Sequence, residues 1–94
     1  MRLHQKGFLL VELCKFSNMW DDELTEKTLN KYEVSGDFRE KTLRIALDEL
    51  SAAGLIKRIE SKLETIEGKE KLLFKNEISD FGISRMRDTG LLLP

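Results

Sequence analysis

The sequence predicts a mostly α-helical domain with one β-hairpin, in the order helix, helix, helix, strand, strand, helix. Three observations indicate this fold class. Apolar residues recur at three- and four-residue intervals as far as Ala53, the pattern becomes compatible with strands after Gly54, and helical spacing returns after Ser79. A chain of 94 residues has the size of a single domain. We therefore expect one domain over residues 1–94, of which 91–94 form an apolar tail.

The first helix is expected over residues 3–17, where Leu9, Leu13 and Phe16 lie at positions i, i+4 and i+7. Its apolar face is widened by four further residues: Phe8, Leu10, Val11 and Cys14. A helix that is apolar on most sides is usually buried by more than one neighbour. In a chain of this size, we expect the second neighbour to be another subunit.

The second helix is expected to follow a break in the pattern over residues 17–22. Asp21 or Asp22 can cap its start, and it runs to about Tyr32. Three acidic residues at a helix start also favour the helix dipole, which is a simpler interpretation than a carboxylate site. Met19 and Trp20 are expected to close the core beside this helix.

The third helix has the clearest start signal of the chain. Asp37 with Glu40 three residues later has the spacing of a capping box. The helix then stops at Gly54, the residue type best suited to the left-handed conformation after a helix end. Its predicted buried face comprises Leu43, Leu47 and Leu50, with Ala46 and Ala53 beside them.

Two strands are expected over residues 56–63 and 71–78, joined by a turn around Gly68 over residues 65–70. A competing interpretation is a short helix in the first of these segments, because Ser61 is followed by Glu64 at capping-box spacing. We favour the hairpin.

Two segments of this chain resemble winged helix-turn-helix regulators of the MarR and PadR kind. The stretch KTLRIALDELSAAGLIKRIE, residues 41–60, is similar to their recognition helix and first wing strand. The stretch FKNEISDFGISRM, residues 74–86, is similar to their second wing strand and the capped helix after it, which begins here at Ser79 and ends near Gly90. The resemblance spans about residues 24–90 and implies a winged helix-turn-helix domain that binds double-stranded DNA.

The major groove of B-DNA admits one α-helix, so a helix held by its apolar face can present the other face to base edges and phosphates. Side chains from the first two turns of the third helix, together with lysines of the hairpin, are therefore the expected contacts. The expected DNA-binding residues are Arg39, Lys41, Thr42, Arg44, Lys62, Lys69 and Lys71. The same helix residues would also suit an ordinary solvated helix face.

Charge gives the DNA interpretation little support. The net charge is −1, and residues 39–75 hold nine basic and seven acidic side chains. The hairpin carries carboxylates that would repel phosphate, among them Glu60, Glu64, Glu67 and Glu70. The alternative function is accordingly a winged helix used for protein contacts, as an adaptor or an inhibitor, without DNA binding.

The sequence lacks the sets of residues that several classes of function require. A single cysteine, Cys14, cannot form an internal disulfide and is expected to be a packing residue. Together with the only histidine, His4, it cannot supply the four ligands of a structural zinc site, so we expect no metal and no cofactor. No catalytic triad or phosphate-binding glycine loop is present, so no enzyme is expected. No apolar run approaches the roughly 20 residues of a membrane helix, which favours a reducing, cytoplasmic setting.

The two ends of the chain predict self-association. Apolar residues surround the first helix, and Leu91, Leu92 and Leu93 form a second apolar segment. Exposed patches of this kind are uncommon on monomers. We expect a homodimer formed by the first helix with the C-terminal helix and tail, acting as a small transcriptional regulator.

Overall fold

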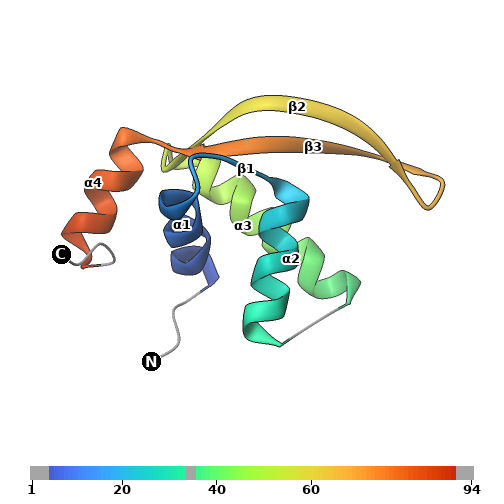
Figure 1. Ribbon diagram of the computed structural model, residues 1–94, viewed down its shortest axis with the longest axis horizontal. Helices are drawn as coiled ribbons and strands as arrows, with labels where there is room; N and C mark the ends of the chain where they lie inside the picture. Colours follow the sequence, from blue (N-terminus) through green and yellow to red (C-terminus); the bar gives the residue numbers. More distant parts are fainter. Residues whose placement is uncertain (1–4, 34–35, 91–94) are drawn as a thin grey trace.

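The computed structural model describes residues 5–33 and 36–90, and for Asp37 and Phe38 the backbone alone. This part of the chain contains four helices and a three-stranded antiparallel sheet (Figure 1). The elements in chain order are α1 (Gln5–Lys15), β1 (Met19–Trp20), α2 (Asp21–Tyr32), α3 (Asp37–Ala52), β2 (Ile56–Ile66), β3 (Lys69–Ile78) and α4 (Asp80–Asp88). The predicted order of helices and hairpin strands is confirmed, with one strand added. In Figure 1 the helices lie along one side of the sheet, and the β2–β3 hairpin extends past α2 and α3.

Strand β1 is the element that the sequence did not predict. It pairs with β3, Met19 opposite Asn76 and Trp20 opposite Lys75, so the strand order is β1-β3-β2. Two residues are too few to show the period-two alternation by which strands are recognised. The consequence for the fold is large, because β1 joins the start of α2 to the middle of the sheet.

The β2–β3 hairpin is longer and its turn tighter than expected. Paired residues run from Ile56 opposite Ile78 to Ile66 opposite Lys69, which leaves only Glu67 and Gly68 in the turn. Both turn residues have positive φ, 53° and 78°, as the favoured two-residue hairpin turn requires. The alternative helix at Ser61 is therefore wrong, since strand pairing continues through this position.

A bulge interrupts the β2–β3 ladder next to the helices. Arg58 pairs with Asn76 and Glu60 with Lys75, so Ile59 is an extra residue without a partner on β3. Bulges of this kind bend the strand and increase its local twist. From Glu60 to Ile66 the pairing is regular.

The N-caps of α2 and α3 are not the aspartates that the sequence predicted. The N-cap of α2 is Trp20, whose N–H donates to the Glu23 carboxylate at 3.4 Å, while Asp21 is the first residue of the helix. The N-cap of α3 is Gly36, and Asp37 is the first residue inside the helix, so Asp37 does not occupy the N-cap position that the predicted capping box gave it. The backbone of Gly36, at φ 106°, suits glycine.

The end of α3 is confirmed as predicted. Gly54 has φ 77°, its N–H donates to the Ser51 carbonyl, and the N–H of Leu55 donates to the Leu50 carbonyl, both at 3.0 Å. These two bonds form the Schellman arrangement that closes a helix with glycine. The chain then enters β2 directly.

The core lies between the helices and the sheet and includes α1. The buried apolar cluster comprises Leu9, Leu10, Leu13, Met19, Leu24, Leu43, Ala46, Leu47, Leu50, Ile56 and Met86. Cys14 packs against this cluster with its Sγ 3.6 Å from the Met86 sulfur, which confirms it as a packing residue. Helix α1 thus covers its leucines within its own chain, and Phe16 remains exposed beyond its end. The apolar face of α1 therefore does not require a second subunit, and the tail, residues 91–94, lies outside the described residues.

Candidate nucleic-acid interface

Helix α3 is held by the core through the face predicted from its leucines. Leu43, Leu47 and Leu50 are between 1% and 4% exposed. The opposite face is open to solvent and includes Lys41, Ile45 and Asp48. A helix anchored in this way has a fixed orientation, which recognition of a groove demands.

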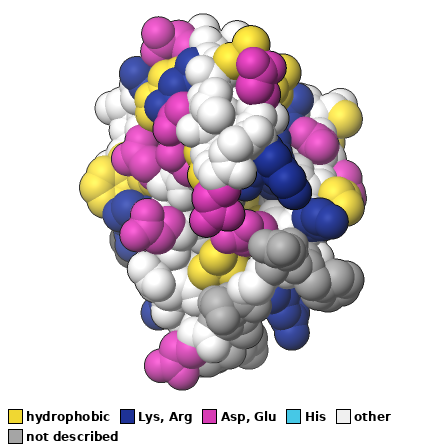
Figure 2. All heavy atoms as spheres, turned by 90° about the vertical axis from the view of Figure 1, so that its right-hand side faces the viewer, with side chains coloured by type: hydrophobic (Ala, Val, Ile, Leu, Met, Phe, Trp, Pro, Cys, Tyr) yellow, Lys and Arg dark blue, Asp and Glu magenta, His cyan; other side chains and the backbone are white. Residues whose placement is uncertain are grey.

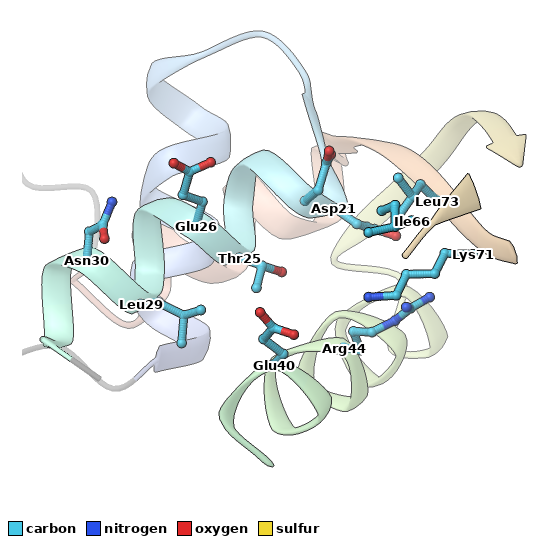
Figure 3. Close-up of a pocket in the computed structure, with 11 residues that line it drawn as sticks. Asp21, Thr25, Glu26, Leu29, Asn30, Glu40, Arg44, Ile66, Lys71 and Leu73 are labelled. Atoms are coloured by element: carbon cyan, nitrogen blue, oxygen red, sulfur yellow. The ribbon is translucent and has the colours of Figure 1, made fainter. Parts of the chain in front are cut away.

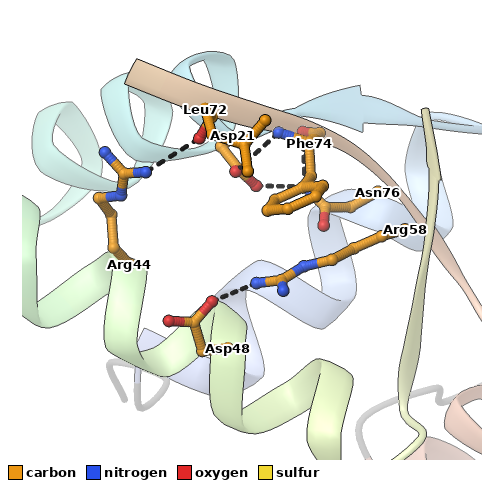
Figure 4. Close-up of polar contacts among 7 residues, drawn as sticks. All are labelled: Asp21, Arg44, Asp48, Arg58, Leu72, Phe74 and Asn76. Carbon is orange, nitrogen blue, oxygen red and sulfur yellow. Dashed lines mark hydrogen bonds and ion pairs between the residues drawn. The ribbon is translucent and has the colours of Figure 1, made fainter. Parts of the chain in front are cut away.

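The predicted DNA contacts on the first two turns of α3 differ in how exposed their side chains are. Arg39, Lys41 and Thr42 are exposed. Arg44 is half-buried, and its Nη2 donates a hydrogen bond of 3.0 Å to the carbonyl oxygen of Leu72 on β3 (Figure 4). Arg44 therefore ties the helix to the hairpin, and only part of its guanidinium remains for another ligand.

The acidic residues in the second half of α3 have basic partners. Asp48 is paired with Arg58 of β2, whose guanidinium lies over the Phe74 ring, 4.2 Å from its centroid (Figure 4). Glu49 is paired with Lys6 of α1 at 2.8 Å. These pairs offset the charge of the two carboxylates close to its source, so they lessen the repulsion that α3 would exert on a phosphate.

The hairpin lysines do not form one basic surface. Lys62 lies over the Trp20 ring at 4.2 Å from its centroid, and its ammonium is 3.1 Å from the Glu64 carboxylate. Lys69 is exposed beside the turn, whereas Lys71 is half-buried. The prediction grouped the three, and the strand register puts them on one face of the hairpin, but the Lys62 ammonium is drawn toward Trp20 of β1 and away from Lys69 at the turn.

A groove of about 450 Å³ lies between α2, α3 and the hairpin. Its lining residues are Asp21, Asp22, Thr25, Glu26, Leu29, Asn30, Glu40, Arg44, Ile66, Lys71 and Leu73. Figure 3 shows the basic ends of Arg44 and Lys71 close together at one end of the groove, with Glu40 and Glu26 farther along it. The structure thus brings together two predicted residues from segments that are far apart in the chain.

The buried polar network behind this groove was not predicted. Asp21 is 6% exposed, and its carboxylate accepts hydrogen bonds from the Phe74 N–H and from the side-chain amide of Asn76. Asn76 is fully buried on β3. A polar residue between the apolar Phe74 and Ile78, on the same face of a predicted strand, was the available signal, because a buried amide needs a partner.

The end of the molecule formed by the hairpin tip has a mixed charge. Figure 2 shows acidic and basic side chains interspersed on this face, with the largest group of basic side chains toward its right-hand side. Ion pairs along the hairpin also bring the two charges together, including Lys75 with Glu60 at 3.1 Å and Lys62 with Glu64. The site is therefore a local arrangement of cations and not a uniformly basic face.

The described residues do not form a metal site or a membrane-spanning helix. Over residues 5–33 and 36–90, no three His, Cys, Asp or Glu side chains are placed to hold a metal ion. His4 lies outside this part of the chain. None of the described helices is long and apolar enough to cross a membrane. In comparisons with known proteins, no family and no curated protein matches this sequence.

Proposed function

We propose that this chain is a winged helix-turn-helix protein that binds double-stranded DNA, with α3 in the major groove and the hairpin beside it. The observation that carries the proposal is the way in which α3 packs on the core. Its leucine face is buried, while Arg39 and Lys41 are exposed in its first two turns. Recognition helices of this class contact bases and phosphates through that part of the helix.

The hairpin supports the same orientation. Because the Arg44 guanidinium donates to the Leu72 carbonyl, the hairpin is held at a set position beside α3. Lys69 at the turn is exposed and well placed to meet a neighbouring phosphate. We assign direct DNA contact to Arg39, Lys41, Thr42 and Lys69, and a positioning role to Arg44. Lys62 and Lys71 add positive charge nearby.

The test is a binding measurement on duplex DNA selected from a random or genomic pool, repeated over a range of salt concentrations. Log affinity should fall linearly with log salt as counterions are released. Arg39→Ala should weaken specific binding by about 1–3 kcal/mol if it reads a base, and Lys41→Ala should lower the salt slope by about one. Arg87→Ala is the matched control, since Arg87 is an exposed arginine on α4, at the other end of the molecule.

A second candidate function is protein contact without DNA. Three exposed apolar side chains favour it: Ile45 on α3, and Leu63 and Leu72 on the hairpin, which are 56%, 69% and 44% exposed. Failure to select any duplex at low salt, with the protein folded, would favour this candidate over DNA binding.

The simplest mode of action for such a regulator is occlusion of its DNA site, as a dimer on two half-sites about 34 Å apart. The homodimer expected through the first helix and the C-terminal helix and tail stays a prediction. On α4 the exposed apolar residue that would serve it is Phe81, 54% exposed.

A further inference from the structure

We propose that the outer edge of β2 is a self-pairing surface, where a second copy of this chain adds its own β2 in antiparallel orientation. β2 is an edge strand in the sheet order β1-β3-β2, so no other strand among residues 5–33 and 36–90 pairs with its outer side. Its backbone groups on that side are a template for another strand. This inference does not depend on DNA binding.

The sequence of β2 restricts how two copies can pair. In antiparallel pairing about a two-fold axis perpendicular to the sheet, residue i of one copy lies opposite residue j of the other, and i + j is the same for every pair. Opposite residues point to the same face of the sheet, so i and j are both odd or both even. The axis therefore passes through a residue. Centred on Lys62, it would place two lysines opposite each other; centred on Glu64, two carboxylates. Centred on Ser61, it reaches the irregular position at Ile59 two residues away.

The register centred on Leu63 avoids all three problems. Lys62 then lies opposite Glu64 of the second copy, and Glu64 opposite Lys62 of the second copy, so the strands make two complementary charge pairs. Ser61 lies opposite a threonine, Thr65. The pairing extends over residues 60–66, the part of β2 whose own ladder with β3 is regular.

The same register explains the most exposed apolar side chain of the hairpin. Leu63 is 69% exposed and lies opposite Leu72 of β3, which is 44% exposed. Pairing two copies at Leu63 places the four leucines in one row across the four central strands of a six-stranded sheet. Neighbouring strands are about 4.8 Å apart, so each leucine would contact the next. On the opposite face, Glu64 already lies beside Lys71 and Lys62 of its own chain and would gain a third lysine.

Sedimentation of the full chain at concentrations up to several hundred micromolar tests the proposal, with charge reversal as the specific probe. The native chain should approach twice its mass of 10.9 kDa. Lys62→Glu places two carboxylates opposite each other in each charge pair, and Glu64→Lys places two lysines there. Each single variant should raise the dimer dissociation constant by about tenfold or more. The double variant, and an equimolar mixture of the two single variants, should recover the dimer, because both restore opposite charges.

Disulfide cross-linking tests the same register without the charge-reversal variants, so its result does not depend on whether those variants fold. Leu63→Cys places its thiol next to the same thiol of the second copy, so mild oxidation should yield a disulfide-linked dimer. Thr65→Cys is the matched control, because its two copies would be four residues apart along the strands, about 13 Å. Cys14 is present in both variants. A monomer at every concentration, a dimer unaffected by both charge reversals, or equal cross-linking of the two cysteine variants would overturn the proposal.

Discussion

Asp21 and Asn76, 55 residues apart in the chain, are joined by a buried hydrogen bond of 2.7 Å from the Asn76 amide to the Asp21 carboxylate (Figure 4). The same carboxylate accepts the Phe74 N–H at 3.0 Å. The Asn76 amide also donates to the Met19 carbonyl at 3.3 Å. The first residue of α2 is thereby attached to both β1 and β3. This attachment sets the position of the helix pair relative to the hairpin, on which the proposed interface depends.

Asp21→Ala should lower the free energy of unfolding by about 1.5–3 kcal/mol, because the buried Asn76 amide loses its shortest hydrogen bond and the Phe74 N–H loses its carboxylate acceptor. Asp22→Ala is the matched control. Asp22 follows Asp21 in the first turn of the same helix and has the same charge, but it is exposed, so its removal should cost less than about 1 kcal/mol. Urea denaturation of the two variants measures the difference. Equal losses would mean that helix charge, and not the buried network, accounts for the effect of Asp21.

Leu47→Ala should destabilise the domain by about 2–5 kcal/mol, because Leu47 is 1% exposed and its truncation leaves a cavity in the core. Lys41→Ala, on the exposed face of the same helix, should leave the melting temperature nearly unchanged while it lowers DNA affinity. Thermal melts and binding titrations on the two variants separate the scaffold from the contact face. Similar thermal damage in both would show that α3 is rotated relative to the arrangement described above.

Gly82→Ala tests the close approach of α4 to the chain after α3. Gly82 is buried, and a Cβ at this position would overlap the Leu55 carbonyl oxygen. Alanine in a helix normally adds up to about 1 kcal/mol of stability relative to glycine. Here overpacking should reverse the sign and destabilise by about 1–3 kcal/mol or more. Ser84→Ala, at an exposed position of the same helix, should be neutral or mildly stabilising. A gain in melting temperature from Gly82→Ala would contradict the close packing of Gly82 against Leu55.

The thiol of Cys14 should react slowly in the folded protein. Burial raises the pKa of the Cys14 thiol above its ordinary value, so less thiolate is present near neutral pH. Alkylation by iodoacetamide at pH 8 should be slower in the native chain than in urea, and the native rate should keep rising at pH values where the denatured rate has levelled off. Equal rates in both states would indicate that α1 opens readily and does not stay packed against α4.

Sequence periodicity was sufficient for those parts of the fold that depend on contacts along the chain. The leucines of α3 predicted which face is buried, since residues three and four apart share one side of a helix. Gly54 predicted the end of α3, because the left-handed conformation after a helix favours glycine wherever the helix lies. Gly68 marked the hairpin turn for a similar reason. In each case the determining interactions lie within a few residues.

The tertiary structure alone decided what depends on distant partners. Asp21 has the sequence context of a helix cap, yet it turns to β3 because β1 carries the start of α2 to Asn76. Arg44 has the position of a base-reading residue, yet the carbonyl of Leu72 lies within its reach. Lys62 is one of five hairpin lysines in the sequence, but only folding brings it over Trp20. A polar side chain takes the partner that the fold places nearest, and that choice is not encoded in its neighbours along the chain.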